Sequence, residues 1–209
     1  MIVLGIDPGY AIVGYGVVEY HNNRFRMLDF GAITTEAHTP FNERLERIYN
    51  CACMLIDRYH PEAMAIEKLF FNTNQKTAID VAQARGVLVL AAQQAKMPIF
   101  EYTPLQVKQS VVGYGRAEKK QMQLTVASLL KLKSVPKPDD AADALAVALC
   151  HAFTNRFGEL FAVGNMTRTK GKNNVGGAAQ LIAEMERRRN ARIAAERAKK
   201  QSTQGDDKK

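Results

Sequence analysis

The sequence predicts an α/β fold with a mixed five-stranded sheet and helices on both of its faces. Three strand-like segments follow one another at the start of the chain, joined by short polar links. Two more strand-like segments come later, and segments of helical periodicity separate them from their neighbours. Hairpin links make neighbouring strands antiparallel, whereas helical crossovers make them parallel. The combination therefore predicts a mixed sheet.

The first three strands are expected at residues 2–7, 12–20 and 24–34. Each of these segments is rich in the β-branched and aromatic residues that favour strands. The links at 8–11 and 21–23 are short enough for hairpins, so we expect an antiparallel meander.

Helices and strands alternate through the rest of the first 155 residues. Apolar side chains recur at three- and four-residue steps over 43–59, and Pro61 follows, as is common beyond a helix C-terminus. The segment TPLQ at 103–106 is typical of a capping box with proline at the first helical position, so a helix begins there. The remaining predicted elements are strands at 63–67 and 98–102 and helices at 77–96, 118–132 and 140–154.

The chain of 209 residues is predicted to contain one domain at 1–155, a polar, glycine-rich linker at 156–177 and a basic, charged helical or disordered tail at 178–209. Its net charge of +8 is unevenly distributed. Residues 1–155 contain 16 Lys and Arg against 15 Asp and Glu, whereas 156–209 contain 13 against 6. The basic character therefore belongs mostly to the segment after the domain.

Membrane and secreted classes are not favoured. The longest apolar stretch, residues 87–92, is too short to span a bilayer, and no basic segment precedes an apolar one at the N-terminus. The three cysteines, Cys51, Cys53 and Cys150, offer neither a disulfide framework nor zinc-ligand spacing. We therefore expect a reduced, cytoplasmic protein that does not associate with membranes.

Two acidic residues stand at the ends of short apolar strands. Asp7 ends the first strand and Glu67 ends the fourth, and small residues precede both on the same strand face. A carboxylate in such a place is costly to desolvate unless it is paired or binds a cation. If the two strands are parallel neighbours, both carboxylates lie at the C-terminal edge of the sheet, where α/β proteins bind ligands. Asp7 taken alone is also a good turn residue, since it opens the segment DPG.

Two further acids lie one turn apart at the start of a buried helix. Asp140 and Asp143 are three residues apart and share one helix face, and the helix after them is apolar nearly all round. Asp140 taken alone also suits a helix N-terminus, although Asp139 is the more suitable N-cap.

Four carboxylates brought together from three elements would repel one another. Hard divalent cations relieve such repulsion, and Mg²⁺ is the best match for oxygen ligands. Two such ions can activate a water and stabilise both oxygens of a phosphoryl displacement. The four acids together therefore predict a metal site suited to cleaving phosphodiesters.

The segment 108–137 carries seven basic residues and one acid, which is typical of an anion-binding surface. Lys108 and Lys119 lie on the apolar stripes of their helices, so their ammonium groups are expected to reach a cleft and contact a phosphate or balance the acids. The alternative is that both extend to solvent at a domain edge. Lys120 points away from the stripe into solvent, and with Arg116 it is a candidate for DNA contacts.

Phe70 and Phe71 follow Glu67 closely and lead into a polar loop. Both rings cannot easily be buried at once. An exposed aromatic ring beside a basic site can stack on bases or wedge between them. Equally, either ring can anchor the loop in the core.

Between residue 2 and about residue 152 the sequence contains six characteristic stretches, in this order: LGIDPG, AIEKLFF, AQARGV, FEYTPLQVKQSVVG, GRAEKKQMQ and DDAADALAVA. Together they resemble the RuvC family of Holliday-junction resolvases, bacterial endonucleases of the ribonuclease H-like, retroviral-integrase fold. The resemblance implies four catalytic acids that bind Mg²⁺, or Mn²⁺ in its place, namely Asp7, Glu67, Asp140 and Asp143. It also implies that Lys108 and Lys119 are active-site lysines and that Phe70 stacks on the junction.

The resemblance further implies a homodimer that places two active sites on four-way junction DNA and nicks two strands of like polarity symmetrically. It also implies a role in recombination and repair together with the branch-migration proteins RuvA and RuvB. The segment 85–92 is apolar on all sides, which fits a dimer interface.

The closest alternative is a ribonuclease H-like nuclease that acts on RNA or another branched nucleic acid, because it would share the fold and the acids. The aromatic loop and the segment QVKQSVVG argue against it. An actin-type ATPase would need a second phosphate loop, which the sequence lacks. A non-catalytic DNA binder is not favoured either, since all four acids are present.

Overall fold

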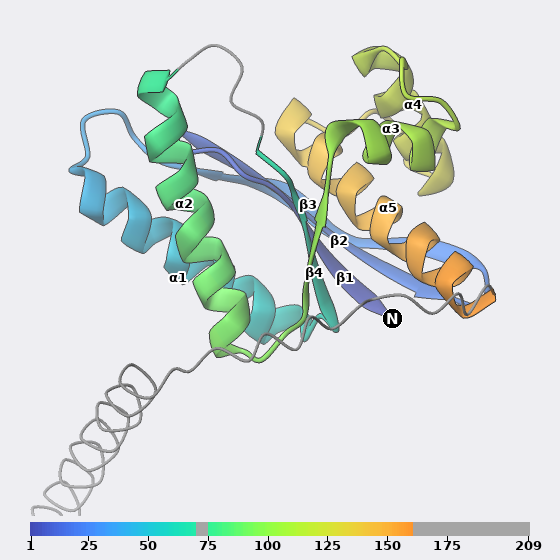
Figure 1. The fold of residues 1–209 in the computed structure, drawn as a ribbon, viewed down its shortest axis with the longest axis horizontal. Helices are drawn as coiled ribbons and strands as arrows, with labels where there is room; N and C mark the ends of the chain where they lie inside the picture. The colour runs from blue at the N-terminus through green and yellow to red at the C-terminus, as the bar shows by residue number, and fades with distance from the viewer. Residues whose placement is uncertain (70–74, 161–209) are drawn as a thin grey trace, which may run out of the picture. The chain divides into compact units, whose positions relative to one another are not determined.

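A computed structural model of the chain describes residues 1–69 and 75–160. Within them, five strands form one sheet in the order β3-β2-β1-β4-β5 (Figure 1). The strands are β1 (Ile2–Asp7), β2 (Ile12–His21), β3 (Arg24–Thr34), β4 (Ala63–Glu67) and β5 (Ile99–Tyr102). β2 is antiparallel to both β1 and β3, whereas β4 is parallel to both β1 and β5. The predicted mixed sheet, with its N-terminal meander, is confirmed.

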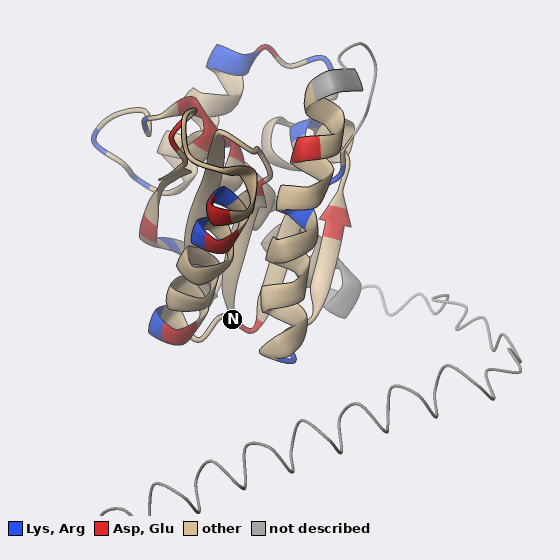
Figure 2. Ribbon diagram, turned by 90° about the vertical axis from the view of Figure 1, so that its left-hand side faces the viewer, with Lys and Arg blue, Asp and Glu red and all other residues tan. Residues whose placement is uncertain are grey.

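Helices cover both faces of the sheet, as predicted (Figure 1). On one face lie α1 (Phe41–Tyr59) and α2 (Gln75–Gln94), and on the other lie α3 (Pro104–Val112), α4 (Lys119–Leu129) and α5 (Asp139–Leu160). Alternation along β1 separates the two cores: Val3 packs with the α5 side, whereas Leu4 and Ile6 pack with α1 and α2. Residues 86–94 of α2 carry no charge, and Figure 2, which views the molecule from the side of α1 and α2, shows this last part of the helix in tan.

A local signal in the sequence sets the start of α3. Thr103 caps α3 through the predicted capping box, in which its hydroxyl accepts a hydrogen bond from the Gln106 amide and the Gln106 side chain accepts one from the Thr103 amide. α5 continues to Leu160, so it extends five residues into the segment predicted as a linker. The rest of that segment, the predicted tail and the predicted site residues Phe70 and Phe71 lie outside the described residues. None of the described helices has the length and apolar character that crossing a membrane requires.

Glycines let α5 approach the sheet very closely. A Cβ added at Gly5 of β1 would lie 2.2 Å from the carbonyl oxygen of Ala144, and one added at Gly14 of β2 would lie 2.0 Å from that of Asp140. No side chain fits at either position, because the helix backbone already occupies the space. The N-terminal part of α5 is therefore held against the strands that carry the site.

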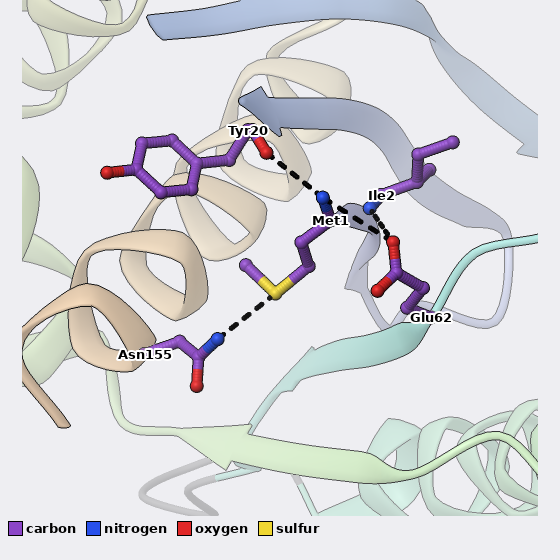
Figure 3. A network of polar contacts seen from close by, with 5 residues as sticks. All are labelled: Met1, Ile2, Tyr20, Glu62 and Asn155. Atoms are coloured by element: carbon purple, nitrogen blue, oxygen red, sulfur yellow. Dashed lines mark hydrogen bonds and ion pairs between the residues drawn. The ribbon is translucent and has the colours of Figure 1, made fainter. Parts of the chain in front are cut away.

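The other end of β1 is fastened by a polar network (Figure 3). The Glu62 carboxylate accepts a hydrogen bond of 3.0 Å from the Ile2 amide and lies 3.4 Å from the Met1 ammonium, which in turn donates to the Tyr20 carbonyl at 3.0 Å. The Asn155 amide also contacts the Met1 sulfur at 3.4 Å. These contacts tie β1 to β2 and to the segment that leads into β4, and so support the register of the three strands.

Candidate active site

Strand register brings Asp7 and Glu67 together. In the parallel pair of β1 and β4, Val3 lies opposite Ala63 and Ile6 lies opposite Ile66. The same register, extended by one residue, places Asp7 beside Glu67 at the C-terminal edge of the sheet. Both side chains are partly exposed there, as a ligand site requires.

The close approach of α5 supplies the other two acids. Gly14 pairs with Asp7 in the register of β1 and β2, and the backbone of Asp140 lies directly over Gly14. The first turn of α5 therefore stands next to Asp7. Asp143 follows one turn later on the same side of the helix, as the spacing in the sequence predicts.

Electrostatic coupling shows how near the acids are to one another. Burial and, after it, the charges of Glu67, Asp143 and Asp140 together raise the pKa of Asp7 from 3.8 to about 7. Burial likewise raises the pKa of Glu67 from 4.5 to about 7, with Asp143 as the second cause. The pKa of Asp143 is also raised by burial, against the opposing effect of Lys119. Four carboxylates thus share one region in which their full ionisation is unfavourable.

Two lysines reach this region from α3 and α4. The Lys119 ammonium lies 3.2 Å from Asp139 Oδ2 and 3.3 Å from Asp143 Oδ2. Lys108 lies near enough to Glu67 to lower the pKa of that carboxyl, in opposition to burial. A single cleft is lined by both lysines and two of the acids, together with four mostly apolar neighbours: Glu67, Asp143, Lys108, Lys119, Pro104, Val107, Met122 and Ala146. The structure therefore places both lysines on the cleft of the acids.

Some predicted residues take other positions. Asp139, predicted as the N-cap, is the first residue of α5, and its carboxylate binds Lys119 and the Gln123 amide instead. The side chain of Lys120 is exposed, as predicted; that of Arg116 is exposed too, and neither residue lines the cleft.

Sequence reasoning overlooked a buried polar pair beneath Glu67. Tyr102 lies opposite Glu67 in the register of β4 and β5, and its hydroxyl is 2.8 Å from Nδ1 of His151 on α5. Burial raises the pKa of Tyr102 to about 12 and lowers the pKa of His151. The pair therefore stays neutral and ties β5 to α5 below the site. No periodicity or motif pointed to a contact between residues so far apart in the sequence.

The donor chemistry of the acids suits a hard divalent cation. Their ligand atoms are all carboxylate oxygens, which favour Mg²⁺ or Mn²⁺. Burial, with repulsion between the carboxylates as the second cause, raises the pKa of Asp7 and Glu67, and a bound cation would stabilise their charged forms. Across residues 1–69 and 75–160, no three Asp, Glu, His or Cys side chains stand close enough together to hold an ion without moving.

Comparison with known proteins identifies relatives over most of the chain. The family model described as "Crossover junction endodeoxyribonuclease RuvC" matches residues 3–151. The crossover junction endodeoxyribonuclease RuvC of Alkaliphilus oremlandii is 60% identical over 163 residues, which are 78% of this chain and 99% of that protein.

Solved structures agree with this match. The Thermus thermophilus RuvC structure superimposes with a TM-score of 0.71 at 40% identity, covering 76% of this chain and 97% of that one. The same protein in complex with a Holliday junction substrate gives a TM-score of 0.70 at 38% identity, with the same coverage. The predicted ribonuclease H-like fold is thereby confirmed.

Proposed function

The chain belongs to the RuvC family of crossover junction endodeoxyribonucleases, and on that premise we propose that it resolves Holliday junctions at a metal site formed by Asp7, Glu67, Asp140 and Asp143. It is an endonuclease that hydrolyses phosphodiester bonds in DNA recombination and repair. The observation that carries the assignment of the site is the convergence of four carboxylates, from β1, β4 and α5, on one edge of the sheet.

The four acids would hold two Mg²⁺ ions per active site, or Mn²⁺ in their place. When bound, the ions would supply an activated water and stabilise the charge that develops on the cleaved phosphate. Asp7 and Glu67 must lose their protons to act as ligands, and their raised pKa values mean that metal and protons compete for them.

The two lysines complete the cleft on its α3 and α4 side. Lys108 stands beside Glu67 and Lys119 beside Asp143, so a phosphate that enters between these residues meets an ammonium group on each side. In this proposal both lysines bind non-bridging oxygens of the cleaved phosphate. When the phosphate binds, part of the contact between Lys119 and the acids is replaced by contact with the phosphate.

Recognition of the branched substrate is assigned to groups around the cleft. Phe70 and Phe71 follow Glu67 in the sequence and are proposed to stack on bases at the junction, where pairing is interrupted. Arg116 and Lys120 are exposed near the start of α4 and are proposed to contact backbone phosphates.

Two active sites are needed for paired, symmetric nicks, so we propose a homodimer. The chain offers α2 as its interface: residues 86–94 carry no charge, and the side chain of Leu90 is 48% exposed. An exposed leucine on an uncharged helix favours association with a second copy. We also propose that RuvA and RuvB act as partners of this dimer, as the family membership suggests, in a bacterial cytoplasm.

The test is cleavage of a synthetic four-way junction in the presence and absence of Mg²⁺, beside linear duplex DNA and an RNA–DNA hybrid. We expect Mg²⁺-dependent cutting of the junction with little cutting of the other two substrates. Equal cleavage of all three would contradict junction resolution, and preference for the hybrid would favour a ribonuclease H-like nuclease that acts on RNA.

A further inference from the structure

A second pocket opens at the same edge of the sheet, on the side of β3 and α1. β3 runs parallel in direction to β1, because each is antiparallel to β2, so Thr34 at the end of β3 lies at the edge where Asp7 ends β1. Thr34 and Asp7 are two strand positions apart, with β2 between them, and their partners on β2 are Ile12 and Gly14. The pocket is lined by three threonines, two arginines and two glutamates: Thr34, Thr35, Thr39, Arg44, Arg47, Glu36 and Glu43.

Arg44 carries a buried charge without an acidic partner. Its side chain is only 7% exposed, its Nε donates to Thr35 Oγ1 at 2.9 Å, and its guanidinium carbon lies 3.6 Å from the centre of the Tyr10 ring. No carboxylate of the described residues lies within 4 Å of it, and its two terminal nitrogens have no hydrogen-bond partner among them. A buried guanidinium with unused donors beside a pocket is suited to bind an anion there.

Arg47 adds a second cation one turn along α1. Its Nε donates to the Thr34 carbonyl at 2.9 Å, which holds the side chain across the pocket and leaves its terminal nitrogens for a ligand. Glu36 and Glu43 are exposed at the rim and form no ion pair with either arginine in the described part of the chain. The arginines are therefore not neutralised by the acids of their own pocket.

Hydrogen bonds connect the pocket to the turn that follows Asp7. The Thr35 hydroxyl donates to the Tyr10 carbonyl at 2.8 Å, and the Thr35 amide donates to the Ala11 carbonyl at 2.9 Å. Tyr10 is in turn covered by the Arg44 guanidinium and by Phe41. A ligand of the arginines would thus be held by the same residues that fix the turn behind the candidate active site.

We propose that this pocket binds a backbone phosphate of the DNA strand that flanks the cleavage site. The proposal rests on the proposed function, since it requires DNA at Asp7. Because Thr34 lies two strand positions across the sheet from Asp7, this phosphate would lie within a few nucleotides of the cleaved bond. Guanidinium groups match the paired oxygens of a phosphate in a way that ammonium groups do not. The contact would fix the register of the strand in the active site without reading its sequence.

The test compares Arg47→Ala with Arg58→Ala, using the full-length protein and a four-way junction. Arg58 is an exposed arginine about three turns further along α1, outside this pocket, and serves as the matched control. Junction affinity is measured at several salt concentrations with metal removed by a chelator, so that no cutting occurs. We expect Arg47→Ala to weaken binding about tenfold and to reduce the slope of log K against log salt by about 1. Arg58→Ala is expected to keep the slope of the unmodified protein.

Arg44→Gln is expected to reduce the slope of log K against log salt by the same amount as Arg47→Ala. Its melting temperature shows whether it is folded. If it does not fold, Arg47→Ala decides alone. The proposal would be overturned if Arg47→Ala and the unmodified protein gave the same slope of log K against log salt. It would also be overturned if Arg47→Ala and Arg58→Ala reduced this slope equally. An unmodified protein that neither binds nor cuts the junction would instead refute the proposed function, which separates the two failures.

Discussion

Replacing Asp7 with asparagine should make the metal-free protein more stable while it removes the nuclease activity. Burial and three neighbouring carboxylates raise the pKa of Asp7 from 3.8 to about 7. A raised pKa means that folding favours the protonated form, so the charged form is destabilising in the folded state. Below about pH 4 the carboxyl is protonated in both states and the penalty is absent; it grows as the pH rises and is complete above about pH 7.

The size of this penalty follows from the difference in pKa. A rise from 3.8 to about 7 corresponds to roughly 4 kcal/mol of unfolding free energy lost at pH 8. Asparagine has nearly the same shape and no charge, but its amide still has to be desolvated. We therefore expect Asp7→Asn to raise the free energy of unfolding by roughly 2–3 kcal/mol at pH 8 without metal, and by little at pH 4.5.

Urea unfolding at the two pH values, with a chelator present, measures the effect directly. Glu46→Gln is the matched control, because it removes an exposed acid of α1 and should change stability by less than about 0.5 kcal/mol. Junction cleavage in Mg²⁺ should be lost in Asp7→Asn, while junction binding is kept. An Asp7→Asn protein that is no more stable than the unmodified one at pH 8 would refute the account of a carboxylate cluster under mutual repulsion.

Three other changes test the site from different sides. Gly14→Ala should lower the free energy of unfolding by roughly 1–3 kcal/mol and reduce cleavage, because its Cβ would lie 2.0 Å from the Asp140 carbonyl oxygen; a urea midpoint equal to that of the unmodified protein would contradict the close approach of α5. Lys119→Ala should lower the cleavage rate about a hundredfold or more while four-way junction binding remains, and an unchanged single-turnover rate would remove this lysine from the site. Deletion of residues 165–209, which are rich in Lys and Arg, should flatten the salt dependence of junction binding, and an identical slope would show that they make no phosphate contacts.

Several elements could be predicted because their signals are local. The capping box at Thr103 and Gln106 depends on residues three apart, and both of its hydrogen bonds form. The pairing that brings Asp7 to Glu67 was only a condition at the level of sequence, because α1 connects β4 to β3 and the sheet places β1, not β3, beside β4. Their roles as metal ligands stay predictions.

Other features could not be predicted because they depend on distances between elements far apart in the sequence. Asp139 looked like a simple helix cap, yet its carboxylate pairs with Lys119 from another helix. The contact of Tyr102 with His151 arises only when β5 packs on α5. Arg44 lies on an ordinary amphipathic helix, and nothing local marks it as a buried cation over Tyr10.

The sequence by itself determined the order and type of the elements, the chemistry of the four acids and the family, because these depend on residue identity, local periodicity and motif order. The tertiary structure decided how near the acids stand, which cations face them and where a second cationic pocket opens. Those outcomes depend on how closely α5 can approach the sheet at Gly5 and Gly14, and on which side chains the packing buries. Such distances are set by the whole fold, because each contact requires elements that are separate in the chain to pack at the same time.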